Sequence, residues 1–113
     1  MSTLRLSGPE VRQVAARFRA LAEPSRLAVL NGLMGGERTV SELVDATGLR
    51  QANVSKHLQV LHRAGFVERR REGLWVRYRV ADPGVERLCA LMCERVPPVR
   101  PRRAATRDAA SER

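Results

Sequence analysis

The segment from Thr39 to Gly65 constrains the fold of this chain more than any other. Thr39 and Glu42 have the spacing of a capping box, which predicts that a short helix begins there. Gly48 follows, and glycine readily takes the left-handed conformation that ends many helices. A second helix is predicted over residues 51–64, directly before Gly65. A short helix, a tight glycine turn and a second helix are typical of a helix-turn-helix.

The second predicted helix is amphipathic. Val54, Leu58 and Leu61 recur at helical spacing and are expected to pack inward. The polar side chains expected to face outward are Gln51, Asn53, Ser55, Lys56 and Gln59. Amide side chains pair with adenine, and lysine reaches guanine or phosphate. This face therefore predicts a helix that reads base edges in the major groove of double-stranded DNA, the alternative being a polar face that is only solvated.

A basic β-hairpin is expected after this helix. Two strands, over residues 66–71 and 74–80, are predicted around a tight turn at Glu72-Gly73. The arginines of this hairpin are Arg69, Arg70, Arg71, Arg77 and Arg79, and the acidic residues within it are Glu68 and Glu72. Such a hairpin can contact phosphates or place an arginine in the minor groove. The alternative is an edge strand protected by charge.

Helices are also predicted on both sides of this region. Ser7 and Glu10 form another capping box, Pro24 is placed to open a second helix that runs to Gly35-Gly36, and Asp82 precedes a last helix that ends by Pro97. The inner face of the first helix is expected to carry Val11, Val14, Ala15, Phe18 and Leu21, which makes it a core element. The predicted fold is mainly α, with about five helices and a two-stranded β-hairpin. The domain is expected to span residues 9–96, between a flexible arm (1–8) and a disordered tail (97–113).

Size and charge favour a small protein with a polyanionic partner. The chain has 113 residues and a formal net charge of +9, although Lys56 is the only lysine among 21 basic residues. One modest core fits this length, and a partner subunit often completes such a core. No apolar run is long enough for a membrane helix or a signal peptide, and two cysteines make no disulfide framework. A soluble cytoplasmic protein is expected, with no membrane association.

Three stretches resemble the ArsR/SmtB family of bacterial repressors: LAEPSRLAVLNGL, QANVSKHLQVLHRAGFV and RRREGLWVRYRV. The resemblance covers about residues 11–96. It implies a winged helix-turn-helix, a homodimer formed through the first and last helices, and a palindromic, inverted-repeat operator. Arg50 stands where a capping serine is usual in the family, and its side chain is free to touch phosphate.

Members of this family leave DNA when a metal ion or an oxidant binds, but the metal sites typical of the family are not expected here. Thr39 and Ser41 align with the thiolates of one site, and only Asp82 is kept from the other. Cys89 and Cys93 lie four residues apart on the last predicted helix, hence on one face. They are candidate ligands for a soft metal ion or targets of a thiol oxidant. The alternative is two small hydrophobes buried in a dimer seam.

The function predicted is that of a sequence-specific, double-stranded-DNA-binding transcriptional regulator, a homodimeric repressor released by a soft metal or thiol-reactive signal. No cofactor is required, and no nucleophile-base pair or phosphate-binding glycine loop suggests an enzyme. The alternatives are a constitutive regulator without an inducer and a non-enzymatic basic module that binds RNA or protein. The candidate DNA-contacting residues are Arg50, Gln51, Asn53, Ser55, Lys56, His57, Gln59, Arg69, Arg70, Arg71 and Arg77.

Overall fold

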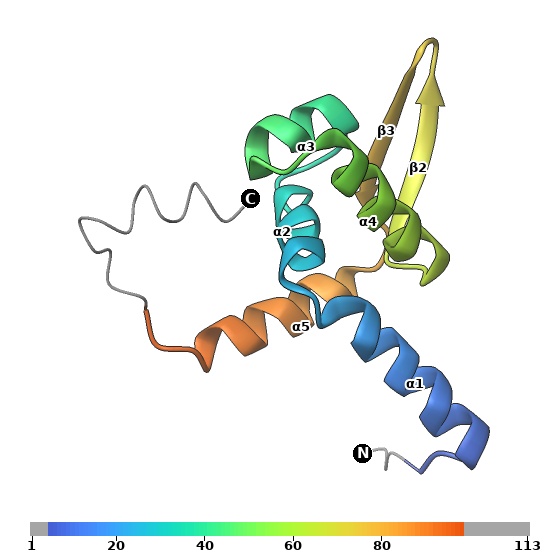
Figure 1. Cartoon of the computed structure of the whole chain (residues 1–113). Coiled ribbons are helices and arrows are strands. Elements are labelled where there is room, and N and C mark those ends of the chain that lie inside the picture. The colour runs from blue at the N-terminus through green and yellow to red at the C-terminus, as the bar shows by residue number, and fades with distance from the viewer. Residues whose placement is uncertain (1–4, 99–113) are drawn as a thin grey trace.

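Five helices and three strands follow one another in residues 5–98, the part of the chain that the computed structural model describes (Figure 1). The elements are α1 (Gly8–Leu21), α2 (Pro24–Gly32), β1 (Arg38–Thr39), α3 (Val40–Thr47), α4 (Gln51–Arg63), β2 (Val67–Glu72), β3 (Trp75–Val80) and α5 (Pro83–Glu94). The predicted class, helical with a small hairpin, is confirmed. The predicted tail lies mostly outside the described residues, which end at Pro98.

Local capping signals set the starts of α1 and α3 as predicted. The Ser7 hydroxyl accepts a hydrogen bond from the Glu10 backbone N–H (3.3 Å), and the Ser7 N–H donates to the Glu10 carboxylate (2.8 Å). The same reciprocal pair joins Thr39 and Glu42 at the start of α3, at 3.1 and 2.9 Å. Gly48 ends α3 with φ 76°, which a residue with a Cβ atom adopts at a cost. The helix-turn-helix therefore has the predicted tight crossing.

The core lies where α2, α3 and α4 meet. Leu30 of α2, Leu43 of α3 and Leu58 of α4 are fully buried there. The inward face predicted for α4 is confirmed, because Val54 and Leu61 are buried as well. Burial of a large aliphatic side chain stabilises a fold by about 1.5–3 kcal/mol, so this contact holds α4 firmly in place.

Helix α1 is the core element that the sequence predicts only at its C-terminal end, where Leu21 packs against the core. Val11, Val14 and Phe18 are exposed, and Ala20 is the one buried residue of the helix. Figure 1 shows α1 extending away from the other helices. Its C-terminal end is attached, because the Arg17 guanidinium donates to the Ala64 carbonyl oxygen (2.7 Å) and stacks on the ring of Phe66. The apolar pattern of α1 is real, but Val11, Val14 and Phe18 remain exposed within residues 5–98.

The end of α2 and the position of the hairpin turn differ from prediction. Helix α2 ends at Gly32, before the expected break at Gly35-Gly36, and residues 33–35 form a turn. The hairpin turn is one residue later than predicted, at Gly73-Leu74, since Glu72 pairs with Trp75. Gly73 has φ 61°, as the first position of a tight hairpin turn requires.

The hairpin belongs to a three-stranded antiparallel sheet of order β1-β3-β2. The short strand β1, which the sequence did not predict, pairs Arg38 with Tyr78 and Thr39 with Arg77. This pairing connects the hairpin to the start of α3. Within residues 5–98, no helix is both long and apolar enough to cross a membrane.

Candidate nucleic-acid interface

The outward face of α4 carries the polar residues that the sequence predicts. Gln51, Asn53, Lys56 and Gln59 are exposed, and Ser55 is half-buried. Their direction follows from the opposite face of the same helix, which is buried against α2 and α3. In Figure 1, α4 lies beside the basic hairpin.

Arg50 precedes α4 and makes no side-chain capping hydrogen bond. Its carbonyl oxygen accepts from the Val54 N–H (3.0 Å), so the helix begins without help from the Arg50 side chain. A serine, threonine, aspartate or asparagine at such a position typically stabilises a helix by about 1 kcal/mol. Arg50 is exposed at the N-terminal end of the polar face, where its guanidinium can meet a phosphate.

His57 lies apart from the other predicted DNA-contacting residues. It is buried, and its Nδ1 accepts from the Arg26 Nε (3.4 Å), while its Nε2 lies 3.7 Å from a carboxylate oxygen of Glu23. Burial lowers the pKa of His57, the Glu23 charge opposes that shift, and the charges of Arg26 and Lys56 add to it. His57 therefore joins α4 to the start of α2 as a neutral side chain, and we leave it out of the proposed contact set.

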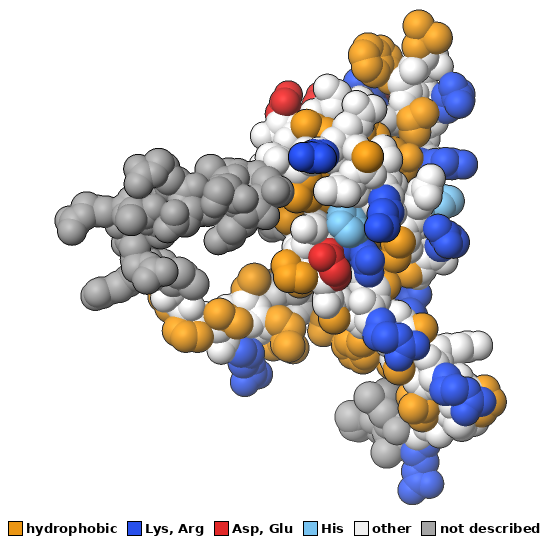
Figure 2. All heavy atoms as spheres, in the orientation of Figure 1, with side chains coloured by type: hydrophobic (Ala, Val, Ile, Leu, Met, Phe, Trp, Pro, Cys, Tyr) orange, Lys and Arg blue, Asp and Glu red, His pale blue; other side chains and the backbone are white. Residues whose placement is uncertain are grey.

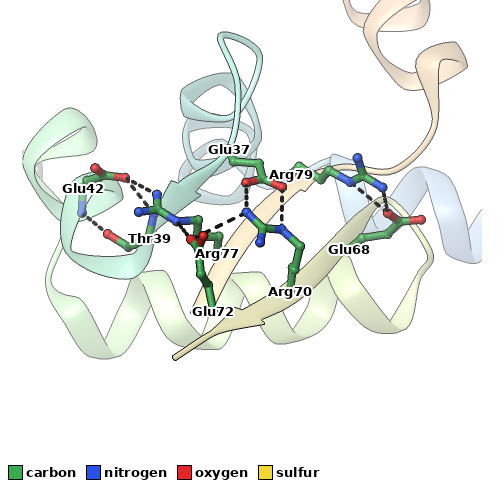
Figure 3. Close-up of polar contacts among 8 residues, drawn as sticks. All are labelled: Glu37, Thr39, Glu42, Glu68, Arg70, Glu72, Arg77 and Arg79. Carbon is green, nitrogen blue, oxygen red and sulfur yellow. Dashed lines mark hydrogen bonds and ion pairs between the residues drawn. The ribbon is translucent and has the colours of Figure 1, made fainter. Parts of the chain in front are cut away.

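Carboxylates engage three of the five hairpin arginines (Figure 3). Arg79 donates to Glu68 (2.7 and 3.0 Å), and Arg70 makes two hydrogen bonds to Glu37 (2.7 and 3.2 Å). Arg77 donates to Glu72 at 2.8 Å. Glu37, which lies outside the hairpin, thus leaves the hairpin with less free positive charge than its own residues indicate.

The missed carboxylates come from the first helix of the helix-turn-helix and the residues just before it. Glu37 precedes β1, and Glu42, which caps α3, lies 4.0 Å from Arg77. The ion pair with Arg70 lowers the pKa of Glu37 and raises the pKa of Arg70. Exposed ion pairs contribute little to stability one by one. Their effect here is geometric, because they connect the hairpin to α3.

Arg69 and Arg71 lie on the other face of the hairpin. Strand alternation separates them from Arg70, and neither has an ion-pair partner within residues 5–98. The residues that line a groove between this face and α4 are Leu58, Gln59, His62, Arg63, Arg69 and Tyr78. Arg63 was missed by the sequence analysis, although its spacing of four from Gln59 places both on one side of α4. The groove adds free cationic groups beside the polar helix face.

The described residues show no cluster suited to a multidentate metal site. No group of three or more His, Cys, Asp or Glu side chains within residues 5–98 is placed to hold a metal ion. Cys89 is half-buried and Cys93 exposed on α5, and both are free thiols. Burial, followed by the neighbouring Cys93, raises the pKa of Cys89, which therefore stays protonated at neutral pH unless a ligand replaces its proton.

Helices α3 and α4 are joined by a turn that contains glycine, and α4 has a polar outer face next to a basic antiparallel hairpin. This arrangement defines a winged helix-turn-helix protein. The hairpin is the wing. Comparison with known proteins then gives the family. A model of the bacterial regulatory proteins of the arsR family matches residues 23–69, and the chain belongs to this family.

Three relatives illustrate the similarity. A probable mercury resistance operon repressor of Streptomyces lividans is 47% identical over 74 residues, which cover 66% of this chain and 59% of that protein. The homodimeric winged helix-turn-helix DNA-binding domain of a possible ArsR-family regulator from Mycobacterium bovis is 40% identical (TM-score 0.69, 80% of this chain, 86% of that chain). Rv0081 of Mycobacterium tuberculosis is 38% identical, with a TM-score of 0.70 over 78% of this chain and 89% of its own.

The environment of His57 predicts a loss of stability in mild acid. The unfolded chain binds a proton at His57 with an ordinary pKa of about 6.5, whereas the folded chain resists that proton. The free energy of unfolding should therefore fall as pH is lowered from about 7.5 to about 5.5. Urea unfolding at a fixed protein concentration measures this fall, which should be smaller in His57→Gln. The exposed His62, changed to Gln, is the control and should keep the wild-type fall; equal falls in both variants would contradict this reading.

Proposed function

We propose that this protein is a non-enzymatic, homodimeric transcriptional repressor that binds an inverted-repeat operator in the bacterial cytoplasm. The observation that carries the proposal is the exposed face of α4, where Gln51, Asn53 and Lys56 project from a helix whose other side is buried. One relative, described as a probable operon repressor, supports repression, and another, described as a homodimeric DNA-binding domain, supports dimerisation and DNA binding.

The proposed contacts fall into two groups. Base edges are read from α4, by Gln51, Asn53, Ser55, Lys56 and Gln59. Phosphates and the minor groove are contacted by Arg50, Arg69 and Arg71. Arg70 and Arg77, which the sequence placed among the contacts, are assigned instead to holding the wing against Glu37, Glu42 and Glu72. RNA is disfavoured as the partner, because its sequence-specific recognition relies on aromatic stacking platforms and the basic face of α4 has none.

The proposed dimer forms through α1 and α5. Both helices expose apolar side chains, such as Phe18 on α1 and Leu91 and Met92 on α5. Figure 2 shows hydrophobic side chains gathered along α5, away from the polar face of α4. An apolar groove also runs between the two helices, with Val14 on one side and Leu88 on the other. A second copy covering these surfaces would place two α4 helices about one DNA turn apart, about 34–36 Å.

Base reading and phosphate contact predict different mutant behaviour. The test duplex is one recovered by selection from random sequence. Asn53→Ala should lower the ratio of affinity for this duplex to affinity for unrelated DNA by a factor of about 10 or more. Arg71→Ala should weaken both duplexes alike and reduce the dependence of log affinity on log salt by about one. Gel shifts at several salt concentrations measure both effects.

Arg79→Ala is the matched control for Arg71, because it removes the same residue type from the same hairpin but from an ion pair with Glu68. It should change the salt dependence less than Arg71→Ala. Retained duplex selectivity in Asn53→Ala combined with Lys56→Ala would rule out α4 as the reading helix.

The dimer surface is tested on α1. Phe18→Glu places a charge in the proposed apolar contact and should weaken dimerisation by a factor of about 10 or more. The folded chain should survive, because Phe18 is exposed in the single chain. Ala16→Glu, on the opposite side of α1, is the control. Sedimentation equilibrium measures the change, and an unaltered dimer in Phe18→Glu would exclude α1 from the interface.

We also propose Cys89 and Cys93 as the site of a soft-metal or thiol-reactive signal. Residues four apart on a helix have Cβ atoms about 5–6 Å apart, which is wide for the roughly 3.5–4.5 Å of a disulfide. Two thiolates suit a soft ion of low coordination number, and one relative is described as a mercury resistance operon repressor. Because both thiols lie on α5, a bound ion would act at the proposed dimer contact. The alternative is a constitutive repressor with no inducer.

Mercuric ion is the probe for this signal. It should release the wild-type protein from the selected duplex at concentrations that leave Cys89→Ser/Cys93→Ser bound, because the variant lacks both soft ligands. Zinc ion is the comparison, since the described residues include no cluster of three or more ligands for it. Equal release of both proteins would favour the constitutive repressor.

A further inference from the structure

The tip of the wing carries two large apolar side chains that are exposed to solvent. Leu74 is 95% exposed, the highest value among the large hydrophobic residues described, and the adjacent Trp75 is 59% exposed. Figure 2 shows hydrophobic side chains at the far end of the hairpin, well away from the core. Most other exposed large apolar residues lie on or beside α1 and α5, where a second subunit can cover them, and Leu27 lies on α2. The wing tip belongs to neither helix.

The fold does not need an apolar residue at this position. The turn depends on Gly73, whose φ of 61° is the positive value that this turn demands, whereas Leu74 has an ordinary negative φ. A polar residue at position 74 would serve the hairpin equally well and would be better solvated. The two side chains therefore point to a partner outside the chain.

The charges around the tip indicate what kind of partner fits. Arg71 lies next to the tip with no ion-pair partner in residues 5–98. The one acidic group there, Glu72, is occupied by Arg77 at 2.8 Å and lies 3.8 Å from Arg70. The wing therefore has an apolar tip beside a free arginine. Such a surface complements a partner that is anionic at its edges and apolar inside. The minor groove of DNA has this character, with phosphates at its rims and stacked bases below.

The width of the minor groove determines how the wing tip can enter it. The minor groove is about 6 Å wide, and the backbones of two paired strands lie about 4.8 Å apart before side chains are added. A hairpin tip therefore enters only where the groove is widened. Apolar wedges such as leucine widen it by partly unstacking a base step, and this bends the duplex towards the major groove.

We propose that Leu74 inserts at a base step in the minor groove beside each half-site and bends the operator, while Trp75 packs against the sugar wall of the groove. This inference rests on the proposed function, because α4 must dock for the wing to reach its groove. It assigns to the wing a role in shape recognition. Operators with a flexible TA or CA step under the wing tip should be preferred, since such steps unstack most easily.

Trp75 provides an internal probe, because it is the only tryptophan in the chain. When the wild-type protein binds the duplex selected from random sequence, Trp75 emission should change and acrylamide should quench it less. Energy transfer between dyes at the two ends of the duplex should report a bend of at least about 20°.

Three substitutions at one position separate a wedge from a phosphate contact. Leu74→Ser should lose most of the bend and about 10-fold in affinity, with the salt dependence unchanged because no charge is removed. Leu74→Met should restore both bend and affinity, since methionine is also used as a wedge. Leu74→Arg should steepen the salt dependence and leave the duplex straight. A wing that only touches phosphates predicts instead that Leu74→Arg improves binding and that Leu74→Ser changes nothing.

An unbent duplex, or equal acrylamide quenching of Trp75 in free and bound protein, would overturn the wedge and leave the proposed function standing. Failure of the wild-type protein to select any duplex would overturn the proposed function, and the wedge with it. Circular dichroism of Leu74→Ser should match the wild type, because the Leu74 side chain is almost fully exposed in the fold.

Discussion

The packing of α4 against α2 and α3 determines which of its side chains face outward. Val54, Leu58 and Leu61 are fully buried in that contact. Each such side chain contributes about 1.5–3 kcal/mol of burial free energy, so a rotation of α4 that exposed them would cost much of the stability of a small domain. The polar face is thereby held outward. The neutral His57, bonded to Arg26, adds a polar link between α4 and α2 on the same buried side.

A second constraint sorts the arginines of the wing. Strand alternation divides them between two faces, and the carboxylates of Glu37, Glu68 and Glu72 meet those on one face (Figure 3). Arg69 and Arg71, on the other face, have no ion-pair partner in the described part of the chain, and Arg69 lines a groove beside α4. The net charge of the hairpin therefore says less about binding than the face on which each charge lies.

Local signals in the sequence were sufficient for the helix-turn-helix. The capping box at Thr39, the left-handed Gly48 and the apolar spacing of α4 each act within a few residues, so each could be read without the fold. Longer-range features could not be predicted. Pairing of β1 with β3 brings Glu37 to Arg70 across 33 residues of sequence, and the burial of His57 depends on a neighbour 31 residues away. For α1 the apolar pattern was read correctly, but periodicity shows only that a face is apolar and not what covers it.

Cleavage of DNA by a chelated iron ion attached to α4 would test the central claim most directly. The ion is tethered to Ala52→Cys, an exposed position on the polar side of α4, in a Cys89→Ser/Cys93→Ser background checked for retained duplex selectivity. If α4 lies in the major groove of each half-site, hydroxyl radicals should cut the selected duplex in two clusters about one helical turn apart, 10–10.5 base pairs. The same ion on Arg87→Cys of α5 should give neither cluster. Uniform cutting from position 52, or stronger cutting from position 87, would contradict the account.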